Sequence, residues 1–404
     1  MQPILIAGGG IGGIATALCL RARGVPFELY EQADAFREVG AGIQLSANAM
    51  RILMKLGLGA DLAHVAVMPR GLEVRSWQSG ERILWTPLGY EAERHFGAPY
   101  YHAHRAEVLE VLVRALGNDA VNLGRKFVSV AEDGEGVALV FDDGTRRTGR
   151  IVVGADGIHS VLRQQLFGSG APRFSGNVAW RGTLPSERVA DLKLEHLSSN
   201  WWGPGRSLVH YFISAGRTHN WIGVGRSDTP SRESWSATGS VDEALEEYAG
   251  WHPQVRAVIA ATTRLYRMAL YDREPLATWR AGRVVLLGDA AHAMLPYHAQ
   301  GAAQSIEDAY VLAGCIAATP DAPLEATARY ESLRKERAEW VQQFSRDAEE
   351  LFNMADPARV ARRDARLREN QQTYAGGFPD GQQRIYGYDA DAALAGTAQE
   401  GRAT

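Results

Sequence analysis

The feature that most constrains the fold is a glycine-rich turn set between a short apolar segment and a helical pattern. Residues 4–7 read Ile-Leu-Ile-Ala, and Gly8-Gly9-Gly10-Ile11-Gly12-Gly13 follows directly. Apolar residues then recur at helical spacing, and a second apolar segment covers residues 27–30. A fully apolar short strand indicates burial on both faces, as in a parallel sheet covered by helices. The N-terminal region therefore predicts a strand, helix, strand unit of an α/β domain.

The glycines of this turn match the pattern Gly-x-Gly-x-x-Gly. Gly8 permits a tight turn, Gly10 lets a pyrophosphate approach the backbone, and Gly13 lets helix and strand pack closely. Glu31, at the end of the second apolar segment, can accept hydrogen bonds from a ribose. The alternative, a glycine-rich turn beside a surface glutamate, is disfavoured by the combination of strand, helix and acid. The motif indicates a dinucleotide but does not separate FAD from NAD.

Two further apolar segments end in glycine and aspartate. Residues 151–153 lead into Gly154-Ala155-Asp156-Gly157, and residues 284–287 lead into Gly288-Asp289. Ligands bind beyond the carboxyl ends of strands in open α/β sheets, so both aspartates are candidate ligand contacts. Either aspartate alone could instead cap a helix or sit in a turn. Together with the glycine-rich turn, they indicate one long ligand.

The middle of the chain has a different pattern of apolar and polar residues. Segments 207–213 and 220–224 alternate and are rich in aromatic residues, which predicts an antiparallel sheet with a hairpin. The predicted fold class is α/β: a Rossmann-like domain, an inserted antiparallel-sheet domain and a C-terminal helical segment. The expected division is 1–70, 98–176 and 274–325 for the first domain, 71–97 and 177–273 for the sheet domain, and 326–404 for the C-terminal region.

Composition and charge narrow the set of partners. Forty-three basic and 47 acidic residues leave a net charge of −4, so neither nucleic acid nor an anionic membrane is an expected partner. No apolar run reaches the roughly 18 residues that cross a bilayer, and no signal segment is recognisable, so a cytoplasmic protein is expected. Cys19, Cys315 and the pair His102 and His104 lack the spacing of a metal site, and no metal is assigned.

The order of these motifs resembles one known family, the single-component FAD-dependent aromatic hydroxylases of the salicylate, 3-hydroxybenzoate and 6-hydroxynicotinate hydroxylase type. The resemblance covers nearly the whole chain. Besides the first glycine-rich turn, the motifs that carry it are Gly40-Ala41-Gly42-Ile43, His104-Arg105, Gly154-Ala155-Asp156-Gly157, Gly288-Asp289 and Ile385-Tyr386-Gly387-Tyr388-Asp389. Flavin disulfide reductases normally need a second dinucleotide fingerprint and a close cysteine pair, and this sequence has neither.

The resemblance implies FAD as the cofactor and NADH or NADPH as the reducing co-substrate. The residues that it assigns to the cofactor are Gly8, Gly10, Gly13, Glu31, Arg37, Arg105, Asp156, Asp289, Gly301 and Ala302. The first four would hold the ADP half of FAD, and the two arginines would contact the nucleotide. Asp289 would bind the ribityl or pyrophosphate part of FAD. The motif around Asp156 would serve both FAD and the nicotinamide donor. The last two begin a predicted helix whose N–H groups would face the pyrimidine edge of the flavin.

Four side chains are candidates for work on the substrate. Strand alternation places His210 and Tyr211 on opposite faces of the predicted strand 207–213. The resemblance places His210 where the 3-hydroxybenzoate members carry a substrate-facing histidine, which makes it the favoured base. A histidine on a strand is otherwise more often a structural residue. Tyr297 and His298 are second candidates, because their loop lines the reacting side of the flavin in the family.

The implied function is a monooxygenase that uses NADH or NADPH and O2 to hydroxylate a small hydroxylated aromatic acid, such as a salicylate, 3-hydroxybenzoate or hydroxynicotinate, through a flavin hydroperoxide. The protein would deprotonate the substrate hydroxyl and exclude water. Two alternatives stay open: an FAD-dependent oxidase or dehydrogenase that inserts no oxygen, and a non-catalytic flavin-binding protein. The sequence fixes neither the substrate nor the ring position, and a homodimer is compatible with the family.

Overall fold

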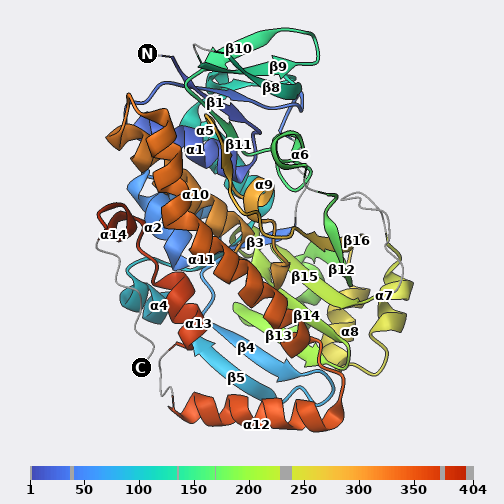
Figure 1. The fold of residues 1–404 in the computed structure, drawn as a ribbon. Coiled ribbons are helices and arrows are strands. Elements are labelled where there is room, and N and C mark those ends of the chain that lie inside the picture. The colour runs from blue at the N-terminus through green and yellow to red at the C-terminus, as the bar shows by residue number, and fades with distance from the viewer. Residues whose placement is uncertain are drawn as a thin grey trace.

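The structure, a computed structural model, describes residues 2–36, 41–133, 136–168, 170–227, 239–373 and 378–396. It has a mixed α/β architecture built around two large sheets. Figure 1 shows the sheet around β1 at one end of the molecule and the sheet around β14 at the other, with long helices running between the two. This is the predicted arrangement of a parallel sheet with helices, an antiparallel sheet and a helical C-terminal segment.

A six-stranded sheet forms around the N-terminal strand, in the order β17-β18-β11-β1-β2-β7. Its strands are β1 (Ile4–Ala7), β2 (Phe27–Tyr30), β7 (Val121–Asn122), β11 (Ile151–Gly154), β17 (Arg280–Ala281) and β18 (Val284–Leu286). All neighbours are parallel except β17 and β18. Every residue of β1 and β11 is buried, because the helix at residues 11–22 and the strands at residues 136–141 and 146–149 pack against this sheet. The predicted N-terminal unit and the two later buried strands are confirmed.

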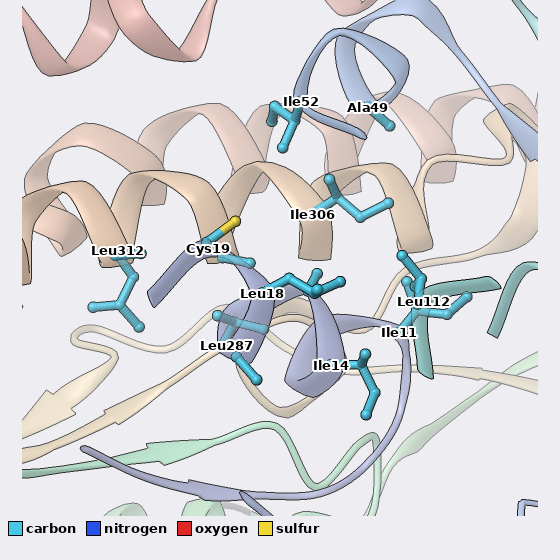
Figure 2. Close-up of a cluster of buried hydrophobic side chains, with 14 of the residues drawn as sticks. Ile11, Ile14, Leu18, Cys19, Ala49, Ile52, Leu112, Leu287, Ile306 and Leu312 are labelled. Carbon is cyan, nitrogen blue, oxygen red and sulfur yellow. The ribbon is translucent and has the colours of Figure 1, made fainter. Parts of the chain in front are cut away.

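Helices pack on this sheet through an apolar core. The main ones are α1 (Ile11–Ala22), α2 (Ala47–Lys55), α5 (Arg105–Leu116) and α10 (Gly301–Ala318). Figure 2 shows Leu18 of α1 gathered with Ile306 of α10 and with Leu287, and all three side chains are buried. A Cβ added to Gly12 would lie 3.2 Å from that of Ser305, so α1 and α10 approach closely near their first turns. The core therefore holds the starts of these two helices together.

The second large sheet has seven strands, in the order β16-β12-β15-β14-β13-β4-β5. Its strands are β4 (Gly71–Ser76), β5 (Arg82–Pro87), β12 (Arg173–Pro185), β13 (Leu197–Gly203), β14 (Arg206–Ile213), β15 (Thr218–Arg226) and β16 (Arg264–Asp272). The pairing is antiparallel except between β4 and β13. The predicted hairpin is confirmed as β14 and β15, joined by η3 (Ser214–Gly216).

One face of the seven-stranded sheet is covered by α7 (Val241–Glu247) and α8 (Pro253–Ala260). Tryptophans of the sheet, Trp180, Trp201 and Trp221, form a buried cluster with residues of these helices. The opposite face is the one that meets the site described below. Because β4 and β5 come from residues 71–87, this sheet is assembled from separate parts of the chain. The domain boundaries expected from the sequence stay a prediction.

Smaller elements complete the fold. The remaining strands are β3 (Gly42–Leu45), β6 (Tyr101–His104), β8 (Phe127–Asp133), β9 (Gly136–Phe141) and β10 (Arg146–Gly149). The remaining helices are α3 (Gly59–Val65), α4 (Gly89–Phe96), α6 (Val161–Phe167), α9 (Asp289–His292), α11 (Pro323–Phe352), α12 (Pro357–Thr373), α13 (Asp380–Tyr386), α14 (Ala390–Leu394), and the short η1 (Asn118–Ala120), η2 (Ser186–Leu192) and η4 (Pro296–His298). Figure 1 shows α11 running from beside α10 to the seven-stranded sheet, and α12 beside β5. Within the described residues, no helix is both long and apolar enough to span a membrane.

Candidate active site

The glycine-rich turn has a backbone that only glycine fits at two positions. Gly8 has a φ of +112°, and a Cβ added to Gly13 would lie 1.9 Å from the carbonyl oxygen of Gly8. A Cβ added to Gly10 would meet nothing within 4 Å. Glu31 closes the turn, because its Oε2 accepts a hydrogen bond from the backbone N–H of Gly9 at 2.7 Å. Gly8 and Gly13 are therefore needed for packing, whereas Gly10 faces open space.

A cavity of about 610 Å³ runs from this turn to the face of the seven-stranded sheet that lies opposite α7 and α8. Eight of the residues predicted from the sequence line it: Gly10, Arg105, Tyr211, Asp289, Tyr297, His298, Gly301 and Ala302. Backbone of the turn and of the start of α10 forms one end, and side chains of β4, β12, β13, β14 and β15 form the other. The structure thus brings candidate cofactor and substrate residues to one continuous space.

The turn end of the cavity fits the diphosphate of a dinucleotide. Helix α1 begins directly after Gly10, and α10 begins at Gly301. Free N–H groups at helix N-termini bind phosphate and other anions. Arg105 adds a positive charge, and the carboxylate of Asp289 is exposed to the cavity, where it can accept hydrogen bonds from sugar or ribityl hydroxyls. This set of donors and acceptors matches an elongated cofactor with central phosphates, such as FAD.

Four described residues among the predicted cofactor contacts do not line the cavity: Gly8, Gly13, Glu31 and Asp156. The Oδ2 of Asp156 accepts a hydrogen bond from the backbone N–H of Val161 at 2.8 Å, so Asp156 folds the loop that leads into α6. Burial raises the pKa of this carboxyl group. Its neighbours Ala155 and Gly157 line the cavity in its place. Asp156 thus has a structural contact through Oδ2, while its Oδ1 has no partner in the described part of the chain, and a contact with the cofactor stays a prediction. Arg37 lies outside the described residues.

The pleat of the seven-stranded sheet decides which side chains reach the cavity. Arg181, Ile222 and Val209 are register partners on β12, β15 and β14, and all three line the cavity. Tyr211 lies on the same face, and burial raises its pKa to about 12. Burial lowers the pKa of Arg181. Sequence reasoning missed Arg181, although an arginine within the apolar alternation of residues 178–184 is a signal that could have found it.

His210 lies on the opposite face of the same sheet. Its partner on β15 is Trp221, and its ring lies 6.4 Å from that of Trp201 and 5.1 Å from that of His219. The side chain is buried, does not line the cavity, and has its pKa lowered to about 4 by burial. The structure therefore does not bring His210 to the cavity lining, and the identity of the base stays a proposal. Strand alternation separated it properly from Tyr211, but the face of Tyr211 is the one that meets the cavity.

The loop around η4 supplies the other two candidates. The hydroxyl of Tyr297 accepts a hydrogen bond from Nδ2 of Asn353 at 3.0 Å. The ring of His298 stacks on Phe344, with centroids 4.0 Å apart. Burial lowers the pKa of His298 to about 4, opposed by a hydrogen bond to the backbone of Phe344. Its Nε2 has no partner in the described part of the chain, so Nδ1 makes that bond and Nε2 is a free acceptor.

A buried ionic network supports the loop that carries Asp289. Asp308 accepts hydrogen bonds from the backbone N–H of Gly288 at 3.0 Å and from Nε of Arg334 at 2.8 Å, and it contacts Nε2 of His292 at 2.6 Å. Burial opposes ionisation of Asp308, but the charges of His292 and Arg334 outweigh it and lower its pKa to about 2. Glu307 pairs with the same arginine. The network fixes this loop against α10 and α11.

The same network reaches the start of α2. Nδ2 of Asn48 donates to Glu307 at 2.6 Å and to Oε1 of Gln300 at 3.1 Å. Nε2 of Gln300 in turn donates to the hydroxyl of Ser46 at 2.9 Å. These bonds tie the residue before α10 to a segment more than 250 positions earlier. They hold the N-terminus of α10 in place at the cavity.

Buried neutral histidines predict a loss of stability in acid. Burial lowers the pKa of His102 to about 3, and neither ring nitrogen has a partner among the described residues. The pKa of His210 is lowered to about 4. Because both values lie below the unfolded value of about 6.5, the unfolded state binds more protons in acid. This stabilisation is complete above about pH 6.5 and is lost as the pH falls toward the folded-state values.

When the pH falls from about 7 to about 5, each of these two histidines should lower the free energy of unfolding of the protein by about 2 kcal/mol. Urea unfolding of the holoprotein at the two pH values measures the sum. The variant His102→Phe should lose correspondingly less stability on acidification. An unchanged pH dependence in that variant would show that His102 is not kept neutral by burial.

Comparisons with known proteins agree with this geometry. Residues 1–345 match the family model described as FAD binding domain. The chain is 41% identical over 368 residues to 3-amino-4-hydroxybenzoate 2-monooxygenase of Streptomyces cremeus, covering 91% of this chain and 92% of that protein. It is 36% identical over 359 residues to 6-hydroxynicotinate 3-monooxygenase of Pseudomonas fluorescens, covering 88% and 93%. The solved structure of Klebsiella pneumoniae HpxO complexed with FAD and uric acid matches with a TM-score of 0.82 at 27% identity, covering 98% and 97%. The resemblance to aromatic hydroxylases and the predicted fold class are confirmed.

Proposed function

We propose that this chain, which belongs to the FAD-binding domain family and is an FAD-dependent aromatic monooxygenase, hydroxylates a small aromatic acid that bears a ring hydroxyl. NADH or NADPH is the reductant, and O2 supplies the oxygen. The observation that carries the proposal is the continuous cavity that joins the glycine-rich turn to Tyr211 and Arg181. Relatives named for 3-amino-4-hydroxybenzoate and 6-hydroxynicotinate are named for compounds of this class.

The chain's own groups bind and orient the cofactor. When bound, FAD would supply the redox chemistry, in which a hydride from the nicotinamide donor and O2 yield one oxygen atom for the ring and one for water. The N–H groups at the start of α1 hold the diphosphate, and Arg105 adds positive charge. Gly301 and Ala302, at the start of α10, would offer backbone N–H groups that stabilise negative charge on the reduced flavin. Ile222 and Val209 give the substrate end apolar walls that exclude water.

Arg181 recognises the substrate carboxylate. A guanidinium group matches a carboxylate with two parallel hydrogen bonds, and such a bond is stronger where protein excludes water. Arg181 is paired in register with Ile222, and Ile222 with Val209. The charge of Arg181 therefore lies beside two apolar side chains of the cavity wall. Tyr211 lies on the same face and stays protonated at neutral pH, because burial raises its pKa. It donates a hydrogen bond to the substrate and does not act as a base.

Arg181→Ala should therefore weaken use of the acid. The expected rise in KM is roughly 30-fold, corresponding to the loss of about 2 kcal/mol from a charged hydrogen bond. The methyl ester of the same substrate, which carries no charge, should show nearly the same KM with the variant as with the unaltered protein. Equal losses for acid and ester, at unchanged FAD content, would remove Arg181 from carboxylate recognition.

His298 accepts the proton of the substrate hydroxyl. Its pKa of about 4 keeps the imidazole neutral at physiological pH, and the residue lines the cavity, with Nε2 buried and without a partner in the described part of the chain. Removing this proton makes the ring electron-rich and ready to accept an oxygen atom. The stacking on Phe344 fixes the plane of the imidazole. His298, and not His210, is thus the proposed base.

Gly10→Ala separates cofactor binding from folding. The added methyl group meets nothing within 4 Å, so the protein should fold as before. It would occupy the space into which the diphosphate fits, at a cost of about 2 kcal/mol, or a roughly 30-fold weaker Kd for FAD. Flavin fluorescence titration of the apoprotein measures the Kd, and circular dichroism checks the fold. Gly13→Ala, which clashes within the protein itself, should instead lower stability.

A further inference from the structure

We propose that Asn200 selects the substrate, and that the hydroxylated acid carries a hydrogen-bond donor, an amino group or a second hydroxyl, on the side of the ring away from its carboxylate. This inference rests on the proposed function, because it takes Arg181 as the partner of that carboxylate. Asn200 lies on β13, is half-buried, and lines the same cavity as Arg181 and His298.

Asn200 interrupts an apolar row on the cavity face of the seven-stranded sheet. The row crosses six strands in register, from β12 to β5, and all of its members line the cavity. Its members are Arg181, Ile222, Val209, Asn200, Val74 and Leu84. Beyond the arginine, Asn200 is the only polar residue of this row. The row therefore presents two polar groups with apolar side chains between them.

One hydrogen bond decides which amide atom Asn200 offers to a ligand. Its Nδ2 donates to the backbone carbonyl oxygen of Ser198 at 3.2 Å. A carbonyl oxygen only accepts, so the amide cannot turn over without losing this bond. Its Oδ1 has no partner in the described part of the chain and, unlike Nε2 of His298, is not enclosed by protein atoms. Asn200 thus offers an acceptor, which calls for a donor on the ligand.

The register also indicates where this donor lies on the ring. Two strands, β15 and β14, separate β12 from β13, so the backbones of Arg181 and Asn200 lie roughly 14 Å apart. The long arginine side chain shortens this gap. A benzoic acid that lies over Ile222 and Val209 with its carboxylate at Arg181 turns its meta and para positions toward Asn200. An ortho substituent would stay at the arginine end of the row.

Apolar neighbours make an unpaired Oδ1 costly. Val74 and Val209 flank Asn200 on the adjacent strands, and Trp202 follows it on the same face of β13. Trp202 stacks on Phe352, with ring centroids 4.4 Å apart. A site that bonds a substrate group discriminates against an analogue without that group, because its own polar atom is then left unpaired. A methyl group in place of the donor should therefore weaken binding.

The test measures binding to the oxidised holoprotein by calorimetric titration, without a nicotinamide and without turnover. One series of acids is 3-amino-, 3-hydroxy- and 3-methyl-4-hydroxybenzoate, and the other is 4-amino-, 4-hydroxy- and 4-methyl-3-hydroxybenzoate. In at least one series, the amino or the hydroxy acid should bind roughly 10-fold more tightly than the methyl acid. The acid that shows this preference identifies the donor as an amine or a hydroxyl.

In Asn200→Leu the same acids should bind within about twofold of one another, because leucine fills similar space and accepts no hydrogen bond. Asn200→Val, which suits a strand, should behave in the same way. The matched control is Asn122→Leu. Asn122 lies on β7, away from the cavity, and its Nδ2 also donates to a backbone carbonyl oxygen, that of Leu29 at 3.0 Å. The control should keep the preference of the unaltered protein.

A preference that persists in both variants of Asn200, or that is lost in the control as well, would overturn the role of Asn200. Equal binding of the donor and methyl acids to the unaltered protein in both series would overturn it too. If the unaltered holoprotein bound none of these acids, the result would contradict the proposed function, and this inference with it.

Discussion

Replacing His298 by glutamine is expected to slow ring hydroxylation by roughly 100-fold or more, the usual contribution of a positioned base. Glutamine keeps a polar side chain of similar reach but cannot take up the substrate proton. FAD content and the rate of flavin reduction by NADH should change little, because His298 lies in the loop after the cofactor motif. Product formed in a single turnover after mixing the reduced protein with O2 and substrate measures the hydroxylation step.

The matched control is His210→Gln. Both histidines were candidates from the sequence, both have a pKa lowered to about 4 by burial, and only His298 lines the cavity. His210→Gln should hydroxylate at close to the normal rate, although its stability changes. A slow His210→Gln with a normal His298→Gln would restore the base that strand geometry argues against.

Arg334→Met should lower the free energy of unfolding by about 3 kcal/mol or more, as expected when a buried ion pair loses one partner. Arg334 is fully buried and pairs with both Glu307 and Asp308, which are fully buried as well. Methionine fills similar space but leaves these two carboxylates with less compensating charge. Arg337 still contacts Glu307 and His292 still contacts Asp308, which limits the loss. Urea unfolding of the holoprotein, followed by circular dichroism, measures it.

Arg359→Met serves as the control for that experiment. Arg359 pairs with Glu350, but both side chains are more than half exposed, so its removal should leave the free energy of unfolding almost unchanged. FAD should also dissociate more readily from Arg334→Met, because Asp308 holds the backbone of Gly288 next to the cavity residue Asp289. Equal stability of the two variants would show that the buried network contributes no more than a surface pair.

Local patterns predicted the elements that depend on neighbouring residues. The glycine-rich turn, the buried strands β1, β11 and β18, and the hairpin of β14 and β15 follow from runs and alternation within about ten residues. The cavity-lining role of Asp289 follows from its place after a buried strand. Asp156 occupies a similar place, but its Oδ2 accepts a hydrogen bond from the backbone N–H of Val161 at the start of α6. Local sequence left both roles open for each aspartate.

Features that depend on how layers meet were not accessible from the sequence. Alternation separated His210 from Tyr211, but only the packing of α7 and α8 on one face shows which residue faces the cavity. The hydrogen bond between Asn48 and Glu307 spans 259 positions, and no local pattern marks it. Arg181 lies in the region 177–273 that was expected to form a sheet, yet its role needs the register of three strands. These contacts arise from long-range assembly of the sheets.

The central claim, oxygen insertion into a hydroxylated aromatic acid, is tested by the yield of product per NADH or NADPH oxidised. The purified holoprotein is given isotopically labelled O2 with 3-amino-4-hydroxybenzoate, 6-hydroxynicotinate, 3-hydroxybenzoate or salicylate, and H2O2 is quantified in parallel. We expect one of these acids to accelerate NADH or NADPH oxidation and to yield about one hydroxylated product per donor, with one labelled oxygen atom and little H2O2. Only H2O2 and unlabelled acid with every compound would contradict the claim and favour an oxidase.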